Sequence, residues 1–223
     1  SQKLLLDDLG IVSLEAVIGP SIGGLMALEF SLLYPDYVKN LISISSGYRL
    51  STIQLLHNLE QAYILDLAKS SKGREAEYLS LARMIAHKTY ISLELLSSRA
   101  KDESKYDKNF LKGFLSTSQE SYMMHQGEKF IQRFTPDSYN SIIKGWQNFY
   151  IDTKEIKKLE NINVLIISVD SDVCFYPEEQ VEFENLLKEN GIKTTMKVIN
   201  STKGHDCFLL EPELFKKKFQ NFI

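Results

Sequence analysis

The stretch GPSIGGLMALEF, residues 19–30, places one serine in a tight, glycine-rich bend and decides how the rest of the chain is interpreted. The apolar run LEAVIG (14–19) is typical of a short buried strand, and the residues after the bend have helical periodicity. A sharp turn from strand to helix strains the backbone of the residue at its tip, and glycines let the two elements approach closely. The pattern G-x-S-x-G in this context predicts that Ser21 is a nucleophile exposed above a sheet.

Two other interpretations of the bend are a purely structural turn and a phosphate-binding loop. The order G-x-G-x-x-G is absent, and no Walker lysine follows. A helix that begins just after Ser21 would instead offer the backbone N–H of Ile22 to a developing oxyanion. We therefore favour the nucleophile and expect Ile22 to be an oxyanion donor.

Strand and helix patterns alternate at both ends of the chain, which predicts a parallel sheet covered by helices. The expected elements after the bend are the strands NLISISS (40–46), NVLIISV (163–169) and TTMKVIN (194–200), and the helices PEEQVEFENLLKENG (177–191) and EPELFKKKFQNFI (211–223). Residues 51–146 have apolar residues at helical spacing and few strand candidates. We predict an α/β core of residues 1–50 and 147–223, interrupted by a helical cap of residues 51–146.

Composition excludes several classes of protein. Hydrophobic residues make up 43% and charged residues 25%, and the net charge of −3 gives no reason to expect a nucleic-acid partner. No apolar run reaches the ~20 residues of a membrane span, so we expect no membrane association and a cytoplasmic location. Cys174 and Cys207 are expected to be buried free thiols, and no histidines or cysteines have the spacing of a metal site.

A serine nucleophile needs a base, and the base needs an acid that orients it. Asp172 follows the strand 163–169 and His205 follows the strand 194–200, at the carboxyl ends of parallel strands where such sites assemble. We predict a catalytic triad of Ser21, Asp172 and His205. Asp170 competes for the acid role, although it could instead bond to loop backbone. The remaining histidines lie in the predicted cap and are expected at its surface or core edge: His57, His87 and His125.

Beyond these patterns, the chain resembles the homoserine O-acetyltransferase family, whose members are acyltransferases built on the α/β-hydrolase fold. The resemblance runs almost end to end, and two blocks within the predicted cap are its most specific part. The matching blocks are AVIGPSIGGLMALEFSLLYPDYV (16–38), ARMIAHKTY (82–90), ESYMMHQGEKFIQRFTPDSY (120–139), SVDSDVCFYPEEQ (168–180) and GHDCFLLE (204–211).

The resemblance implies a reaction of methionine biosynthesis, in which the acetyl group of acetyl-CoA moves to Ser21 and then to the hydroxyl of homoserine. Acetyl-CoA is then a substrate, and no tightly bound cofactor or metal is implied. The resemblance assigns the acceptor's carboxylate to Arg83, with Tyr90 beside it, and the acceptor's amino group to Asp206. A fork-shaped cation and an anion suit these two groups. The resemblance further implies a homodimer formed through the cap.

Two alternatives stay open. Pro20 stands where the family usually has a second glycine, and a G-P-S elbow also occurs in relatives that look like plain esterases. An ester hydrolase with the same triad would pass the acyl group to water, and a non-catalytic chain would keep the cap only as a dimerisation surface. The resemblance also leaves open acetyl or succinyl as the acyl group, and homoserine or serine as the acceptor.

The chain begins close to the elbow, whereas members of the resembled family have a long segment before it. We therefore expect a fragment without the first strands and without the loop that supplies the second oxyanion N–H. The strand 14–19 would then be an exposed apolar sheet edge. One missing oxyanion donor typically lowers turnover by ~10²-fold to 10³-fold, so we expect impaired activity of the chain as it stands.

Overall fold

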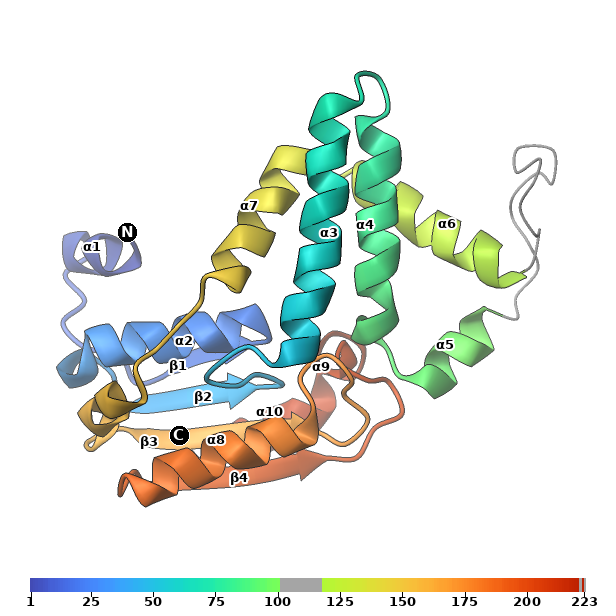
Figure 1. Ribbon diagram of the computed structural model, residues 1–223. Helices are drawn as coiled ribbons and strands as arrows, with labels where there is room; N and C mark the ends of the chain where they lie inside the picture. The colour runs from blue at the N-terminus through green and yellow to red at the C-terminus, as the bar shows by residue number, and fades with distance from the viewer. Residues whose placement is uncertain (101–117, 221, 223) are drawn as a thin grey trace. The chain divides into compact units, whose positions relative to one another are not determined.

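The computed structural model describes residues 1–100, 118–220 and 222 of the 223-residue chain (Figure 1). It contains two compact units. The first comprises Ser1–Arg49, Tyr150–Ser201 and Cys207–Ile223, and the second comprises Leu50–Phe149 and Thr202–Asp206. The short segment Thr202–Asp206, which the sequence pattern grouped with the sheet, therefore belongs to the helical unit.

A parallel sheet forms the centre of the first unit. Its strands β1 (Val17–Pro20), β2 (Asn40–Ile44), β3 (Asn163–Val169) and β4 (Thr194–Ile199) lie in the order β1-β2-β3-β4. All three pairings are parallel, which confirms the predicted α/β architecture. The carboxyl ends of the strands consequently meet at one edge of the sheet, where the segments after β1 and β3 begin.

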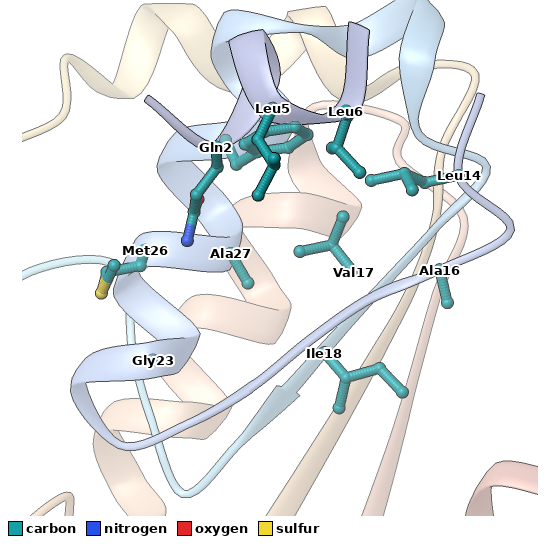
Figure 2. Close-up of a pocket in the computed structure, with 11 residues that line it drawn as sticks. Gln2, Leu5, Leu6, Leu14, Ala16, Val17, Ile18, Gly23, Met26 and Ala27 are labelled. Carbon is teal, nitrogen blue, oxygen red and sulfur yellow. The ribbon is translucent and has the colours of Figure 1, made fainter. Parts of the chain in front are cut away.

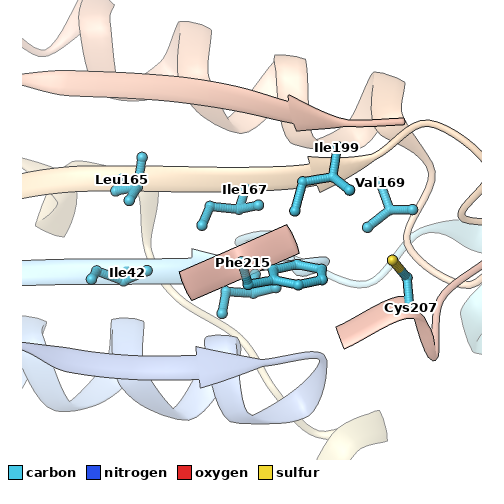
Figure 3. Packing of buried hydrophobic residues seen from close by; sticks show 8 residues of the cluster. Ile42, Leu165, Ile167, Val169, Ile199, Cys207 and Phe215 are labelled. Atoms are coloured by element: carbon cyan, nitrogen blue, oxygen red, sulfur yellow. The ribbon is translucent and has the colours of Figure 1, made fainter. Parts of the chain in front are cut away.

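Helices cover both faces of this sheet, so β2 and β3 are almost entirely buried. Contacts place α2 (Ile22–Leu33) on β1 and β2, and α8 (Pro177–Glu189) on β3 and β4. A compact apolar cluster joins the sheet to α9 (Cys207–Leu210) and α10 (Glu213–Gln220) (Figure 3). Its buried members are Ile42, Ile44, Leu165, Ile167, Val169, Ile199, Cys207 and Phe215. Both cysteines are free and buried, as predicted, and burial raises the pKa of the Cys207 thiol.

An apolar groove of about 470 Å³ lies beside β1 (Figure 2). Within the described residues β1 is the end strand of the sheet, and its Ile18 side chain is 47% exposed. The apolar sheet edge expected from the sequence is therefore present. The groove is lined by residues of α1 (Gln2–Asp8), β1, α2 and the segment before β1: Gln2, Leu5, Leu6, Leu14, Ala16, Val17, Ile18, Gly23, Met26, Ala27 and Phe30.

The second unit is helical and consists of α3 (Thr52–Ser70), α4 (Glu75–Tyr90), α5 (Leu93–Arg99), α6 (Ser118–Ile131) and α7 (Pro136–Gln147). Helices α3 and α4 form an antiparallel hairpin, with α6 against α4 and α7 against α3 (Figure 1). A core of Leu65, Leu79, Ala82, Phe130, Tyr139 and Ile143 holds them together. Two short 3-10 helices of the first unit complete the described elements: η1 (Pro35–Tyr37) and η2 (Thr153–Leu159). None of the described helices is both long and apolar enough to cross a membrane.

Candidate active site

Ser21 occupies the turn between β1 and α2 in a backbone conformation that side chains rarely adopt. Its φ is 55° and its ψ is −129°. The Ser21 N–H donates to the carbonyl of Ile44 at 2.9 Å, and the Ser21 carbonyl accepts from the N–H of Gly24 at 2.9 Å. Both sides of the serine are thus anchored, one to the end of β2 and one to the first turn of α2. The turn has the strain expected of a nucleophile elbow.

Two glycines make this turn possible. A Cβ atom on Gly19 would lie 1.9 Å from the carbonyl oxygen of Gly23, and one on Gly24 would lie 2.4 Å from Cβ of Ser46. A Cβ atom on Gly23 itself would make only an ordinary contact, at 3.4 Å from Cδ of Pro20. The close approaches therefore fall on Gly19 and on Gly24, which lies outside the five-residue pattern and was missed by it.

Ile22 is the first residue of α2, so the helix itself provides no backbone acceptor for its N–H. Ser21 makes no side-chain capping bond to this helix end. The positive end of the helix dipole adds to the attraction for an anion. The backbone N–H of Ile22 therefore remains a candidate oxyanion donor.

Asp172 is better placed than Asp170 to be the acid of a triad. It is 2% exposed, and its Oδ1 accepts the backbone N–H groups of Cys174 at 2.8 Å and Phe175 at 2.9 Å. The exposed Asp170 instead binds the segment after β4, through Nδ2 of Asn200 at 2.8 Å and the N–H of Ser201 at 3.0 Å. The Asp170 carboxylate joins the segments after β3 and β4. The Asp172 carboxylate is held by backbone N–H groups of its own loop.

The helical unit brings four predicted residues together. The rings of Tyr90 and His205 lie 6.3 Å apart, and the N–H of Asp206 donates to the carbonyl of Tyr90 at 2.7 Å. Cζ of Arg83 lies 4.7 Å from the centre of the Tyr90 ring and 4.9 Å from that of Phe130, in cation–π range of both. In the described part of the chain Arg83 forms no ion pair, so its charge remains open to an anionic ligand.

The segment that carries His205 is fixed by the residues before α5. Gly204 has a φ of 77°, and a Cβ atom on it would lie 2.3 Å from the backbone nitrogen of Ser92. The Ser92 N–H donates to the carbonyl of Lys203 at 3.3 Å, and the Ser92 hydroxyl donates to the carbonyl of Thr202. His205, which is 2% exposed, is consequently held against the end of α4.

The structure thus places the predicted residues in two groups. Ser21, Ile22 and Asp172 belong to the unit with the sheet, and Arg83, Tyr90, His205 and Asp206 belong to the helical unit. Among the described residues, no group of three or more His, Cys, Asp or Glu side chains could hold a metal ion.

His87 contributes to the second group, although the sequence suggested a surface or core-edge position for it. It is 4% exposed, and its ring lies 6.5 Å from Tyr90 and 5.7 Å from Tyr122. Burial lowers the pKa of His87 to about 4, and the nearby charges of Arg83 and Arg99 act in the same direction. The spacing of Arg83, His87 and Tyr90 along α4, which puts all three on one helix face, is the pattern that could have identified it.

Acidification is expected to destabilise the protein through His87. The pKa of about 4 in the folded state lies below the unfolded value of 6.5, so the unfolded chain binds the proton first as pH falls. The free energy of unfolding should therefore decrease between pH 6.5 and about 4, by up to about 3 kcal/mol from this group. Urea unfolding across this window measures the decrease, and His87→Phe should make it smaller. An identical decrease in His87→Phe would show that His87 does not cause the loss of stability at low pH.

Comparison with known proteins supports a common ancestry over the whole chain. A homoserine O-acetyltransferase of Methanosphaera stadtmanae is 33% identical over 239 residues, which cover 100% of this chain and 48% of the relative. A homoserine O-succinyltransferase of Acinetobacter baylyi is 33% identical over 238 residues, covering 100% of this chain and 61% of the relative. The chain therefore spans about half to three fifths of the length of these relatives.

Solved structures show the same fold. A homoserine O-acetyltransferase from Bacillus anthracis has a TM-score of 0.87 at 23% identity, over 99% of this chain and 62% of that one. Esterase E22 has a TM-score of 0.88 at 18% identity, over 99% of this chain and 64% of that one. A family model described as alpha/beta hydrolase fold matches residues 2–212. The chain belongs to the alpha/beta hydrolase fold family.

Proposed function

We propose that the protein is an acyltransferase that moves an acetyl group from acetyl-CoA to the hydroxyl of homoserine through an acyl-serine intermediate. The observation that carries the proposal is the cluster in which Tyr90 contacts Arg83, His205 and Asp206. An amino acid acceptor has a carboxylate and an ammonium group, and this cluster supplies a cation and an anion. The names of the relatives, which are 33% identical to the chain over the aligned residues, support the same activity.

In the first half-reaction, Oγ of Ser21 attacks the carbonyl carbon of the thioester while His205 takes the hydroxyl proton. Asp172 orients His205 and stabilises the imidazolium that forms. The N–H of Ile22 stabilises the oxyanion of the tetrahedral intermediate. The carbon–sulfur bond then breaks, and CoA leaves as the thiol with the proton from His205.

In the second half-reaction, the hydroxyl oxygen of homoserine attacks the acyl-Ser21 carbonyl, and His205 takes the hydroxyl proton. The bond from the acyl carbon to Oγ of Ser21 breaks, and His205 returns the proton to Oγ. Arg83 binds the acceptor's carboxylate, Tyr90 lies beside it, and Asp206 binds the ammonium group. These contacts orient the acceptor hydroxyl, which favours it over water.

A carboxylic ester hydrolase with the same triad is the second candidate. Pro20 in the elbow favours it, and esterase E22 has the same fold. The two activities differ in how well the acyl-enzyme is shielded from water. Release of CoA from acetyl-CoA, measured with and without homoserine, separates them: acceleration by homoserine supports the transferase, and indifference to homoserine supports the hydrolase.

The acyl donor within this proposal is acetyl-CoA, used as a substrate rather than as a bound cofactor. The succinyltransferase among the relatives keeps a succinyl donor as the alternative. Parallel assays with acetyl-CoA and succinyl-CoA decide between them by the ratio of their kcat/KM values. We place the reaction in methionine biosynthesis, in the cytoplasm where acetyl-CoA is used.

The proposal includes a homodimer formed through the helical unit. Helix α3 exposes a row of apolar side chains at helical spacing, which is typical of a surface that packs against another helix. Sedimentation should therefore give the mass of two copies, and the mass of one copy would contradict the dimer. The exposed residues are Leu56 (50%), Leu59 (46%), Tyr63 (68%) and Leu67 (52%).

Replacing Arg83 with alanine is expected to raise the KM for homoserine by about 10²-fold, because a bidentate, charge-assisted contact to the carboxylate is lost. The rate of CoA release without acceptor should not change. The KM of Arg83→Lys should lie between those of the unchanged protein and Arg83→Ala, since lysine keeps the charge but not the fork-shaped guanidinium. Steady-state kinetics with varied homoserine measures the effect.

Arg133 provides the matched control for Arg83. It is exposed and stacks on Phe134 at 5.8 Å, so Arg133→Ala removes an arginine–aromatic contact of the same kind. The KM of Arg133→Ala for homoserine should equal that of the unchanged protein. If Arg83→Ala and Arg133→Ala behaved alike, Arg83 would have no part in acceptor binding.

A further inference from the structure

A pair of side chains, the buried His87 on α4 and the half-buried Tyr122 on α6, lies next to the proposed acceptor site and has no part in the reaction as described. Nε2 of His87 lies 3.0 Å from the Tyr122 hydroxyl. The His87 ring also meets the Tyr90 ring edge-on, at 6.5 Å and 90°. The pair therefore links α6 to the Tyr90 ring, over which the Arg83 guanidinium lies.

The packing of α4 against α6 brings the two residues together. A Cβ atom on Gly127 would lie 2.0 Å from Oγ of Ser80 and 3.1 Å from the Ser80 carbonyl oxygen, so the two helices are in close contact here. From this contact, α4 continues toward His87 while α6 leads back toward Tyr122, so the same pair of helices makes both contacts. Their close packing therefore fixes the distance between His87 and Tyr122.

The protonation of His87 follows from its surroundings. Burial and the two nearby guanidinium groups keep the imidazole neutral. Its Nδ1 is buried and has no hydrogen-bond partner among the described residues. A buried N–H without an acceptor is rarer than an unpaired acceptor, and positive charges nearby favour a lone pair at Nδ1. Both conditions favour the tautomer with the proton on Nε2, which donates to the Tyr122 oxygen.

Arg83 depends on the same group of rings. Its guanidinium lies over both Tyr90 and Phe130, at 4.7 Å and 4.9 Å from the ring centres. The orientation of Tyr90 thus limits the positions open to Arg83, and His87 packs against Tyr90 from the side. A group that binds a carboxylate through two bonds tolerates little displacement.

We propose that His87 is a positioning residue, whose bond to Tyr122 and contact with Tyr90 hold Arg83 in place for the acceptor's carboxylate. This inference rests on the proposed function. It extends that function, because neither His87 nor Tyr122 touches the reacting atoms. Their effect should appear in acceptor binding and not in the transfer of the acyl group to Ser21.

The test uses substitutions in the intact protein. Tyr122→Phe removes only the hydroxyl, and His87→Phe keeps a ring but removes the N–H. Each should raise the KM for homoserine about 5-fold to 10-fold, which corresponds to one hydrogen bond, and leave CoA release without acceptor unchanged. The double variant should be no worse than either single one, because both remove the same bond. Tyr150→Phe, at a tyrosine 78% exposed after α7, is the control.

A conservative variant distinguishes positioning from simple packing. The side-chain amide of glutamine can place an N–H where Nε2 of His87 lies, so His87→Gln should keep a KM close to the original, and His87→Asn should not. An unchanged KM in His87→Phe and Tyr122→Phe would overturn the inference. An equal loss in both half-reactions, together with a lower Tm, would also overturn it.

The ¹⁵N spectrum of the imidazole gives a readout that does not depend on activity. We expect a neutral Nε2–H form of His87 at neutral pH, with its resonance shifted by Tyr122→Phe; an Nδ1–H form or an imidazolium would contradict the inference. CoA release indifferent to homoserine in the unchanged protein would overturn the proposed function. Clear dependence on homoserine, with no effect of either substitution, would overturn only the role of His87.

Discussion

Replacing Ser21 with alanine is expected to lower acyl transfer by on the order of 10⁴-fold or more, because no other group can form the covalent intermediate. Stability should change little, since alanine can occupy the same turn and the anchoring bonds of Ser21 come from its backbone. The measurements are CoA release in the presence of homoserine and the Tm of the variant.

Ser45 supplies a demanding control for this substitution. It follows β2, is 0% exposed and also has a positive φ, of 44°. Its hydroxyl has no hydrogen-bond partner among the described residues, so Ser45→Ala removes a buried serine without breaking a bond. This variant should keep its activity. If Ser21→Ala retained transfer at the level of Ser45→Ala, Ser21 would not be the nucleophile.

Replacing Gly19 with alanine is expected to destabilise the protein by on the order of 3 kcal/mol or more. The added Cβ would lie 1.9 Å from a backbone oxygen of Gly23, and neither atom belongs to a flexible side chain that could move aside. The clash can be relieved only if the turn that carries Ser21 opens. Urea unfolding measures the loss, and activity should fall together with stability.

Gly23→Ala tests whether the clash, rather than the loss of any glycine, is responsible. The Cβ atom there would be 3.4 Å from Pro20, and alanine is the better helix former in the first turn of α2. Its free energy of unfolding should therefore stay within about 1 kcal/mol of the original. Equal losses for Gly19→Ala and Gly23→Ala would contradict the tight turn described here.

The central strands were predictable because covered parallel strands are continuous apolar runs. The prediction for residues 163–169 is confirmed, since β3 is Asn163–Val169. The strand expected at 14–19 is shifted, because Leu14 makes only an isolated bridge to Val38 and regular pairing begins at Val17. The strand expected at 40–46 ends at Ile44, where the positive φ of Ser45 turns the chain.

Choices among neighbouring side chains needed the folded structure. The sequence left Asp170 and Asp172 as rivals, and what separates them is the backbone bonds that each carboxylate receives. The closeness of Gly24 to Ser46 depends on how α2 packs, which the G-x-S-x-G pattern does not contain. The burial of His87 likewise depends on a distant helix, α6, packing at Gly127.

The acyl-serine intermediate is tested by the mass of the protein after it is mixed with acetyl-CoA in the absence of an acceptor. The acyl-serine mechanism predicts the mass of one added acetyl group, located on the peptide that contains Ser21, and its rapid loss when homoserine is added, with O-acetylhomoserine as the product. An acetyl group that is found on another residue, or that leaves Ser21 at the same rate with and without homoserine, would contradict it.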